Sequence, residues 1–181
     1  MPKPKRRKPG RPGLDGSAAH RLRFFSLAKV LTECQTDPME SEEHQGFVMP
    51  AYECLEKLRI GEADAFEYQQ LYYMLLTGLE IVNLVHKKAA NTETLQAIEP
   101  MRQSVRAALD SMRSIDMRFA RSGKIGTAAD ELNALRHAVR WIDEAMLNLT
   151  RGEFARAEIQ GRTKMAHILS KYAHMGPREN G

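Results

Sequence analysis

Apolar residues recur at intervals of three and four along most of the chain, which is the period of one face of an α-helix. Over residues 92–121 the spacing is 3, 4, 3, 4, 3 and 4, through Ile98, Met101, Val105, Ala108, Met112, Ile115 and Phe119. Residues 128–150 repeat it with Leu132, Leu135, Val139, Ile142, Met146 and Leu149. Such seams favour side-by-side helices. Because the connector 122–126 is short, we predict an antiparallel hairpin.

Four further helices are predicted, over residues 20–35, 38–60, 65–88 and 153–172, the last being shorter. The first has an apolar face formed by Phe24, Leu27, Leu31 and Cys34. Pro50 is expected to kink or split the second helix, because proline removes one backbone hydrogen bond. Gly61 should end that helix, and Gly161 should interrupt the last one.

Several residues next to these segments have the chemistry of helix caps. Asp37 is a candidate N-cap, with Pro38 in the first turn that follows. Asp64 and Glu67 resemble a capping box at the start of helix 65–88. Thr127 is the expected N-cap of helix 128–150, and Gly152 is expected to end it.

Helix 65–88 is the most apolar segment, with fourteen Ala, Phe, Tyr, Leu, Met, Ile or Val among residues 65–85. A helix that is apolar on most sides is typical of the centre of a bundle. Polar residues such as Glu80 argue against a membrane span. We expect Glu80 to face a groove or to pair with an arginine of the fourth or fifth helix. The alternative is a buried carboxylate with a raised pKa, in a cleft with His86 or His137.

These elements predict an all-α fold, an up-and-down bundle of four long and two shorter helices. The chain of 181 residues is long enough to bury a core without disulfides or metals. The bundle is predicted to span residues 20–173. Residues 1–19 form a basic tail that we expect to be disordered, and residues 174–181 a flexible C-terminus.

Positive charge is concentrated at the N-terminus. Residues 1–23, the basic leader, carry eight cations against Asp15, a net charge of +7, so the remaining residues sum to −3 of the total +4. Like-charge blocks of this kind are typical of tails that bind nucleic acid. The candidate nucleic-acid-binding residues are Lys3, Lys5, Arg6, Arg7, Lys8, Arg11, Arg21 and Arg23.

The leader resembles an AT-hook, a short motif that enters the minor groove of A·T-rich DNA. Gly10-Arg11-Pro12 matches the second half of the motif's core, whereas Pro9 stands where its first arginine is expected. The resemblance implies that Arg11 is attracted by the negative potential of a narrow minor groove. A solubilising tail without a partner is the alternative interpretation.

Two segments, Lys8–Asp15 and Leu149–Ala157, resemble a group of small uncharacterised helical proteins of proteobacterial accessory genomes, loosely labelled Fis-type regulators. The resemblance implies a helical body behind a basic leader in a regulatory setting, and it supplies no catalytic residues. A helix–turn–helix in the last two helices is not expected. Arg156, Gln160 and Arg162 occupy positions where that motif buries apolar side chains.

Motifs for enzymatic chemistry are lacking in the sequence. It has no phosphate-binding glycine loop, no metal-ligand spacing and no nucleophile motif, so we expect neither a cofactor nor a metal. Cys34 and Cys54 are expected to be buried thiols, which suits a reducing cytoplasm. An enzyme with a site assembled from dispersed residues is the least favoured interpretation.

The predicted function is that of a non-enzymatic accessory or regulatory protein that binds nucleic acid through its tail. Its helical body would dimerise or hold a protein partner, and no membrane partner is expected. The alternative is an inhibitor or adaptor encoded by a mobile element, which binds a protein and carries a passive tail.

Overall fold

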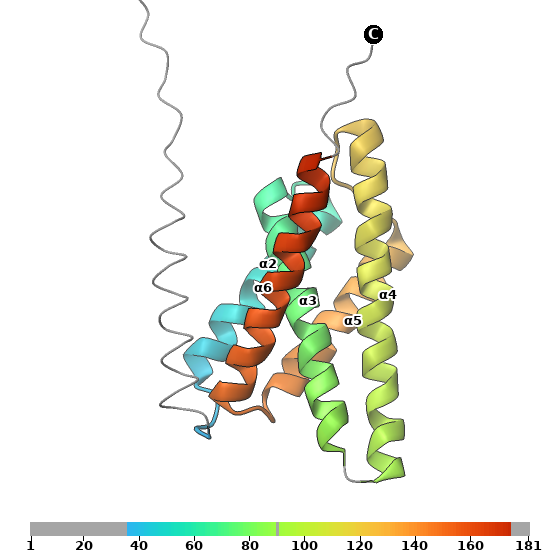
Figure 1. The fold of residues 1–181 in the computed structure, drawn as a ribbon. Helices are drawn as coiled ribbons and strands as arrows, with labels where there is room; N and C mark the ends of the chain where they lie inside the picture. Colours follow the sequence, from blue (N-terminus) through green and yellow to red (C-terminus); the bar gives the residue numbers. More distant parts are fainter. Residues whose placement is uncertain (1–35, 90, 175–181) are drawn as a thin grey trace, which may run out of the picture.

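The computed structural model describes residues 36–89 and 91–174, and this part of the chain is all-α (Figure 1). Consecutive helices run in opposite directions as an up-and-down bundle, which confirms the predicted fold class. The described residues contain no strand, only an isolated bridge between Pro38 and Thr150. The predicted helix 20–35 and tail 1–19 lie outside the described residues. The helices are α2 (Ser41–Ile60), α3 (Ala65–Lys88), α4 (Thr92–Ser122), α5 (Ala129–Met146) and α6 (Arg151–His174).

Helix α3 lies at the centre of the bundle and packs against each of the other four helices. Its predicted bounds are confirmed. The predicted capping box is also present, since the Glu67 N–H donates to Asp64 Oδ1 over 2.8 Å and the Asp64 N–H donates to Glu67 Oε2 over 3.1 Å. Its buried residues, which face several directions around the helix, are Tyr68, Leu71, Tyr72, Met74, Leu75, Leu76, Thr77, Gly78, Ile81 and Val82.

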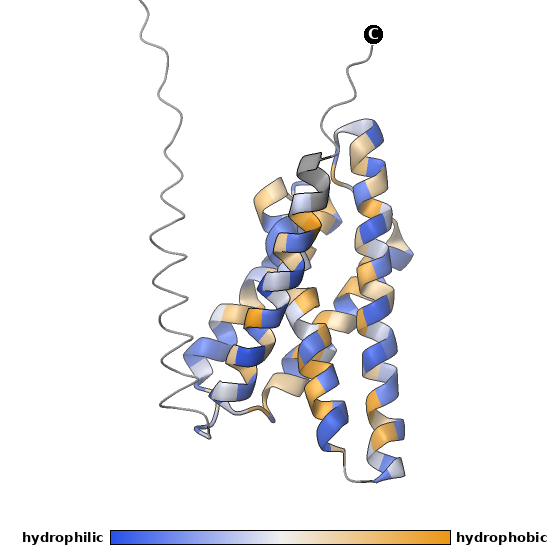
Figure 2. Cartoon of the chain, viewed as in Figure 1, coloured by the Kyte–Doolittle hydropathy of each residue, from blue (hydrophilic) through white to orange (hydrophobic). Residues whose placement is uncertain are grey.

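Helices α4 and α5 form the predicted antiparallel hairpin, and hydrophobic residues alternate with hydrophilic ones along α4 (Figure 2). Val105 and Ile115 are fully buried in this seam, and Met101 is partly buried. Phe119 differs from the prediction because its side chain is exposed. It lies in the last turn of α4, and α5 begins only at Ala129, so no helix of the hairpin covers it.

The predicted start of α2 is wrong. Its N-cap is Glu40 rather than Asp37. The Asp37 carbonyl accepts a 2.8 Å hydrogen bond from the Arg151 N–H, and Pro38 pairs with Thr150. These two residues therefore fasten the chain to the first turn of α6 instead of opening a helix.

The two predicted helix breakers in this region behave differently. Pro50 lies inside α2 without splitting it, because proline removes only one backbone hydrogen bond of a helix that is packed on its neighbours. Gly61 ends α2 as predicted. Its φ of 77° is left-handed, and its N–H donates to the Leu58 carbonyl.

Both ends of α5 also differ from the prediction. Helix α5 starts after Ala128, whose N–H donates to Glu131 Oε2 over 2.8 Å, so Thr127 is not its N-cap. Helix α5 ends at Met146, and the predicted stop, Gly152, lies in the first turn of α6.

Helix α6 starts with a capping box that was not predicted from the sequence. The Thr150 N–H donates to Glu153 Oε2 over 3.0 Å, and the Glu153 N–H donates to Thr150 Oγ1 over 3.3 Å. This reciprocal pair satisfies two backbone donors that a new helix leaves open. Helix α6 therefore begins at Arg151 and, with 24 residues, is as long as α3 rather than a shorter helix.

Gly161 does not interrupt α6; it allows α6 to approach α3. A Cβ atom at this position would lie 2.1 Å from Thr77 Oγ1 and 2.9 Å from the Thr77 Cα and backbone nitrogen. Real side chains do not tolerate such distances to backbone atoms, so the two helices meet closely only because residue 161 has no side chain.

Gly161→Ala is therefore expected to destabilise the protein by about 1–3 kcal/mol, the usual effect of an overpacked contact. Alanine favours a helix over glycine by about 1 kcal/mol, so a net loss reports the clash with Thr77. Urea denaturation followed by circular dichroism measures the change. The control is Ala166→Gly at an exposed position of the same helix, which gives the propensity difference alone. A gain in stability from Gly161→Ala would contradict the proposed packing.

Candidate functional site

The eight candidate nucleic-acid-binding residues all lie outside the described residues, in the range 1–35. The structure therefore leaves their assignment as a prediction. What it describes is the body behind the leader, including the polar clusters and the charge of its surface. The polar clusters and the surface charge determine which surfaces suit an anionic partner.

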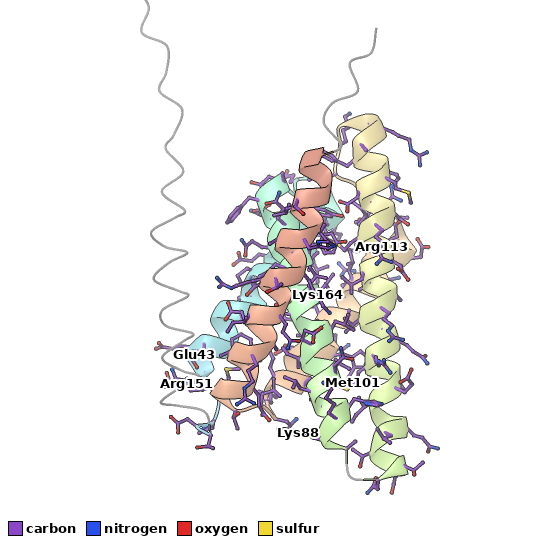
Figure 3. All side chains as sticks on the ribbon, in the orientation of Figure 1. Glu43, Lys88, Met101, Arg113, Arg151 and Lys164 are labelled. Atoms are coloured by element: carbon purple, nitrogen blue, oxygen red, sulfur yellow. The ribbon has the colours of Figure 1, made fainter. Side chains whose placement is uncertain are left out.

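Glu80 has a different partner from the one expected. It forms an ion pair with Lys164 of α6, which Figure 3 labels, and not with an arginine of α4 or α5. The reason is that α6 covers this side of α3. The Glu80 side chain is largely buried, whereas Lys164 remains exposed. The pair therefore stands at the edge of the α3–α6 contact.

The most buried charged group of the described residues is Glu158 of α6, whose exposed fraction is 2%. The Tyr73 hydroxyl donates to Glu158 Oε1 over 2.7 Å, and Arg162 Nη2 donates to the same oxygen over 2.7 Å. Arg162 Nε also donates to the Tyr73 hydroxyl oxygen over 3.2 Å, and the guanidinium lies 5.7 Å from the centroid of the Tyr73 ring. The three side chains thus form a polar cluster between α3 and α6.

The electrostatics of this cluster favour a structural role. Burial, followed by the charge of Glu158, raises the pKa of the Tyr73 hydroxyl far above its usual value of 10. Burial is the largest single effect on Arg162 and lowers its pKa, but the hydrogen bonds and charges of Glu158 and Tyr73 together outweigh burial, so the pKa is raised. Tyr73 therefore remains a neutral donor and Arg162 a cation at neutral pH. Neither is poised for proton transfer.

A second polar cluster joins α2 to α5 around Asp143. His44 Nε2 lies 2.8 Å from Asp143 Oδ1, and the Tyr52 hydroxyl donates to Asp143 Oδ2 over 2.9 Å. Burial, followed by this hydrogen bond, raises the pKa of Tyr52 to about 12. Tyr52 is therefore a neutral donor at physiological pH, and the cluster links the two helices.

Cys54 is a buried free thiol on α2, as predicted. Burial raises its pKa to about 12, so the reactive thiolate is scarce at neutral pH. The other cysteine, Cys34, lies outside the described residues. Cys54 is therefore a core side chain rather than a nucleophile.

The described residues offer neither a metal site nor a membrane-spanning helix. Residues 36–89 and 91–174 hold no group of three or more His, Cys, Asp or Glu side chains placed to bind a metal ion. None of the helices in the same ranges has the length and apolar character needed to cross a membrane.

The segment that contains α2 is strongly acidic. Residues 37–67 contain nine acids against Lys57 and Arg59, a net charge of −7. Arg151 of α6 neutralises part of this charge by forming ion pairs of 3.1 Å with Glu40 and 2.6 Å with Glu43 (Figure 3). The acids are Asp37, Glu40, Glu42, Glu43, Glu53, Glu56, Glu62, Asp64 and Glu67.

A segment with this net charge is unsuited to a phosphate backbone, because like charges repel. Comparison of the chain with protein-family models, with curated proteins and with solved structures gave no match. The charge pattern and the geometry described above are therefore the basis for a functional proposal.

Proposed function

We propose that the chain is a non-enzymatic accessory or regulatory protein that binds nucleic acid through its basic leader. The observation that carries this proposal is the division of charge, with +7 in residues 1–23 and −7 in residues 37–67. An anionic polymer is attracted by the first segment and repelled by the second. Binding would thus be confined to the leader, and the helical body would remain available for a protein partner or for dimerisation.

Duplex DNA is the proposed form of nucleic acid, because Gly10-Arg11-Pro12 suits an A·T-rich minor groove. The lysines and arginines around it would contact phosphates, which fixes position without reading sequence. A reducing cytoplasm is the proposed compartment, since Cys54 is a free thiol.

Salt dependence provides the first test. If about five cationic side chains of the leader meet phosphates, log K should fall with log salt with a slope of roughly −4 to −5 on duplex DNA. Deleting residues 2–17 should remove most of the affinity and leave the melting temperature unchanged, since no predicted helix includes them. Fluorescence anisotropy with a labelled duplex measures the affinity. Full-length protein that binds no duplex or single strand at low salt would refute the proposal.

A matched pair of substitutions separates groove insertion from phosphate attraction. Arg11→Ala should weaken binding to an A·T-rich duplex more than Lys3→Ala does, because only Arg11 lies in the Gly-Arg-Pro core. The two variants lose the same charge. Equal effects would leave phosphate attraction alone, without minor-groove insertion.

An inhibitor or adaptor encoded by a mobile element is the second candidate function. It is favoured by two large apolar side chains on either side of the α2–α3 turn, Ile60 with 52% exposed and Phe66 with 68% exposed. Exposed apolar side chains of this size are typical of protein contacts when they gather in one patch. Absence of salt-dependent nucleic-acid binding would promote this candidate.

A further inference from the structure

The outer face of α2 has an apolar centre that the described residues leave uncovered. Met49, in the middle of the helix, is 50% exposed. Gly46 and Pro50 lie beside it and line a pocket between α2 and α3, together with Phe47 and Tyr73. A Cβ atom at Gly46 would meet no atom within 4 Å, so there is open space above this turn. We call Gly46, Met49 and Pro50 the α2 patch.

Acidic residues flank the α2 patch on the same exposed side of the helix. Glu42 lies two turns before Met49, and Glu53 lies one turn after it. An occupant that matches this face therefore combines an apolar stripe with positive charge. Residues 20–35 have that chemistry in their sequence, because the spacing of Phe24, Leu27 and Leu31 predicts one shared face of a helix. Their cations, Arg21, Arg23 and Lys29, outnumber the single acid, Glu33.

The described chain begins where such a segment could reach the α2 patch. The hydrogen bond from Arg151 to the Asp37 carbonyl and the Pro38–Thr150 bridge hold the chain near the start of α2. Only residues 36–40 separate the predicted helix 20–35 from α2, a length common for connections between antiparallel helices. A helix of 16 residues is about 24 Å long, so it fits along the 20 residues of α2.

We propose that residues 20–35 form a helix that packs antiparallel to α2 and covers the α2 patch. In this arrangement Leu31 lies over Gly46, Leu27 lies over Met49 and Pro50, and Arg23 lies near Glu53. The short tether gives the segment a high effective concentration, which favours it over a second copy of the chain. The part of the basic leader that precedes residue 20 would then join the body near the C-terminal end of α2.

Hydrogen exchange of the full-length protein, measured by mass spectrometry without nucleic acid, tests this proposal. In the wild type, amides 22–34 should exchange at least tenfold more slowly than in an unfolded chain. Leu27→Asp and Met49→Lys should each remove that protection, the first from the segment and the second from the α2 patch. Because no nucleic acid is present, failure here is independent of the proposed function.

Two matched controls make the result specific. Ser26→Asp adds the same charge as Leu27→Asp on another side of the predicted helix, and Met117→Lys repeats the second change at an exposed methionine of α4. Both should keep the protection. The proposal is overturned if the wild type shows no protection of residues 22–34 or if Met49→Lys leaves it unchanged. It is also overturned if protection falls on tenfold dilution, which would identify a second copy as the occupant.

Discussion

Val105→Asp is expected to unfold the helical body or to bring it to the edge of unfolding. Val105 is fully buried in the seam of α4. An aspartate there places an unpaired carboxylate in the core, which costs of the order of 3–5 kcal/mol. That is a large part of the 5–15 kcal/mol by which a typical domain is stable. Urea denaturation followed by far-ultraviolet circular dichroism measures the loss.

Met101→Asp is the matched control, because it introduces the same side chain one turn earlier on the same face of α4. Met101, labelled in Figure 3, is only partly buried, so the carboxylate can turn towards water and the loss should be clearly smaller. The apolar spacing alone predicts that Met101 and Val105 are equally buried. Equal losses at both positions would contradict the burial described for α4.

Long helices with strong periodicity were predictable from sequence. The bounds of α3 follow from its capping box and its long apolar run, and the seam of the α4–α5 hairpin follows from side-chain spacing, because an apolar face must be buried whatever it packs against. The Asp64–Glu67 capping box was predictable for a similar reason, since all of its hydrogen bonds are local.

Some of the wrong predictions concern residues whose role is set by another helix. Asp37 has the chemistry of an N-cap, but its carbonyl accepts a hydrogen bond from the Arg151 N–H instead of opening α2. Gly152 and Gly161 have the chemistry of helix breakers, but the first lies in a capped turn and the second is needed for contact with Thr77. Gly161 thus shows that a glycine can mark a close approach instead of a helix stop, and only the tertiary contact distinguishes the two.

The polar clusters were harder to predict from the sequence than the helix ends. Glu158 and Arg162 are four residues apart, a spacing that predicts an ordinary surface pair on one helix. Nothing in the sequence places Tyr73, which lies 85 residues earlier, over them. An acid inside the apolar stripe of α6, between Ala157 and Met165, was the one available signal that this pair is buried.

Glu158→Ala is expected to destabilise the protein by about 3 kcal/mol or more. The Arg162 guanidinium, which is 17% exposed, would lose its counter-charge, and the Tyr73 hydroxyl would lose its acceptor. Breaking a buried pair by removing one partner leaves an uncompensated charge, which is the costly outcome. Thermal and urea denaturation measure the loss.

Glu80→Ala provides the comparison, because it also breaks a carboxylate–cation pair between α3 and α6. Lys164 is exposed and remains solvated without Glu80, so the loss should be about 1 kcal/mol or less. A loss at Glu158 no larger than that at Glu80 would show that water or another group replaces the buried partner.

The double variant Glu158→Leu and Arg162→Leu tests whether the buried ion pair stabilises the fold or only specifies how α6 packs on α3. Replacing both members of a buried ion pair by apolar side chains is often neutral or stabilising, so the double variant should recover much of the loss seen in Glu158→Ala. Adding Tyr73→Phe removes the remaining unpaired hydroxyl and should recover more. In that case the cluster's contribution is to fix how α6 crosses α3, and the variants should show it as broadened amide resonances rather than as a lower free energy of unfolding. If the double variant is as unstable as Glu158→Ala, the cluster instead contributes net stability to the α3–α6 contact.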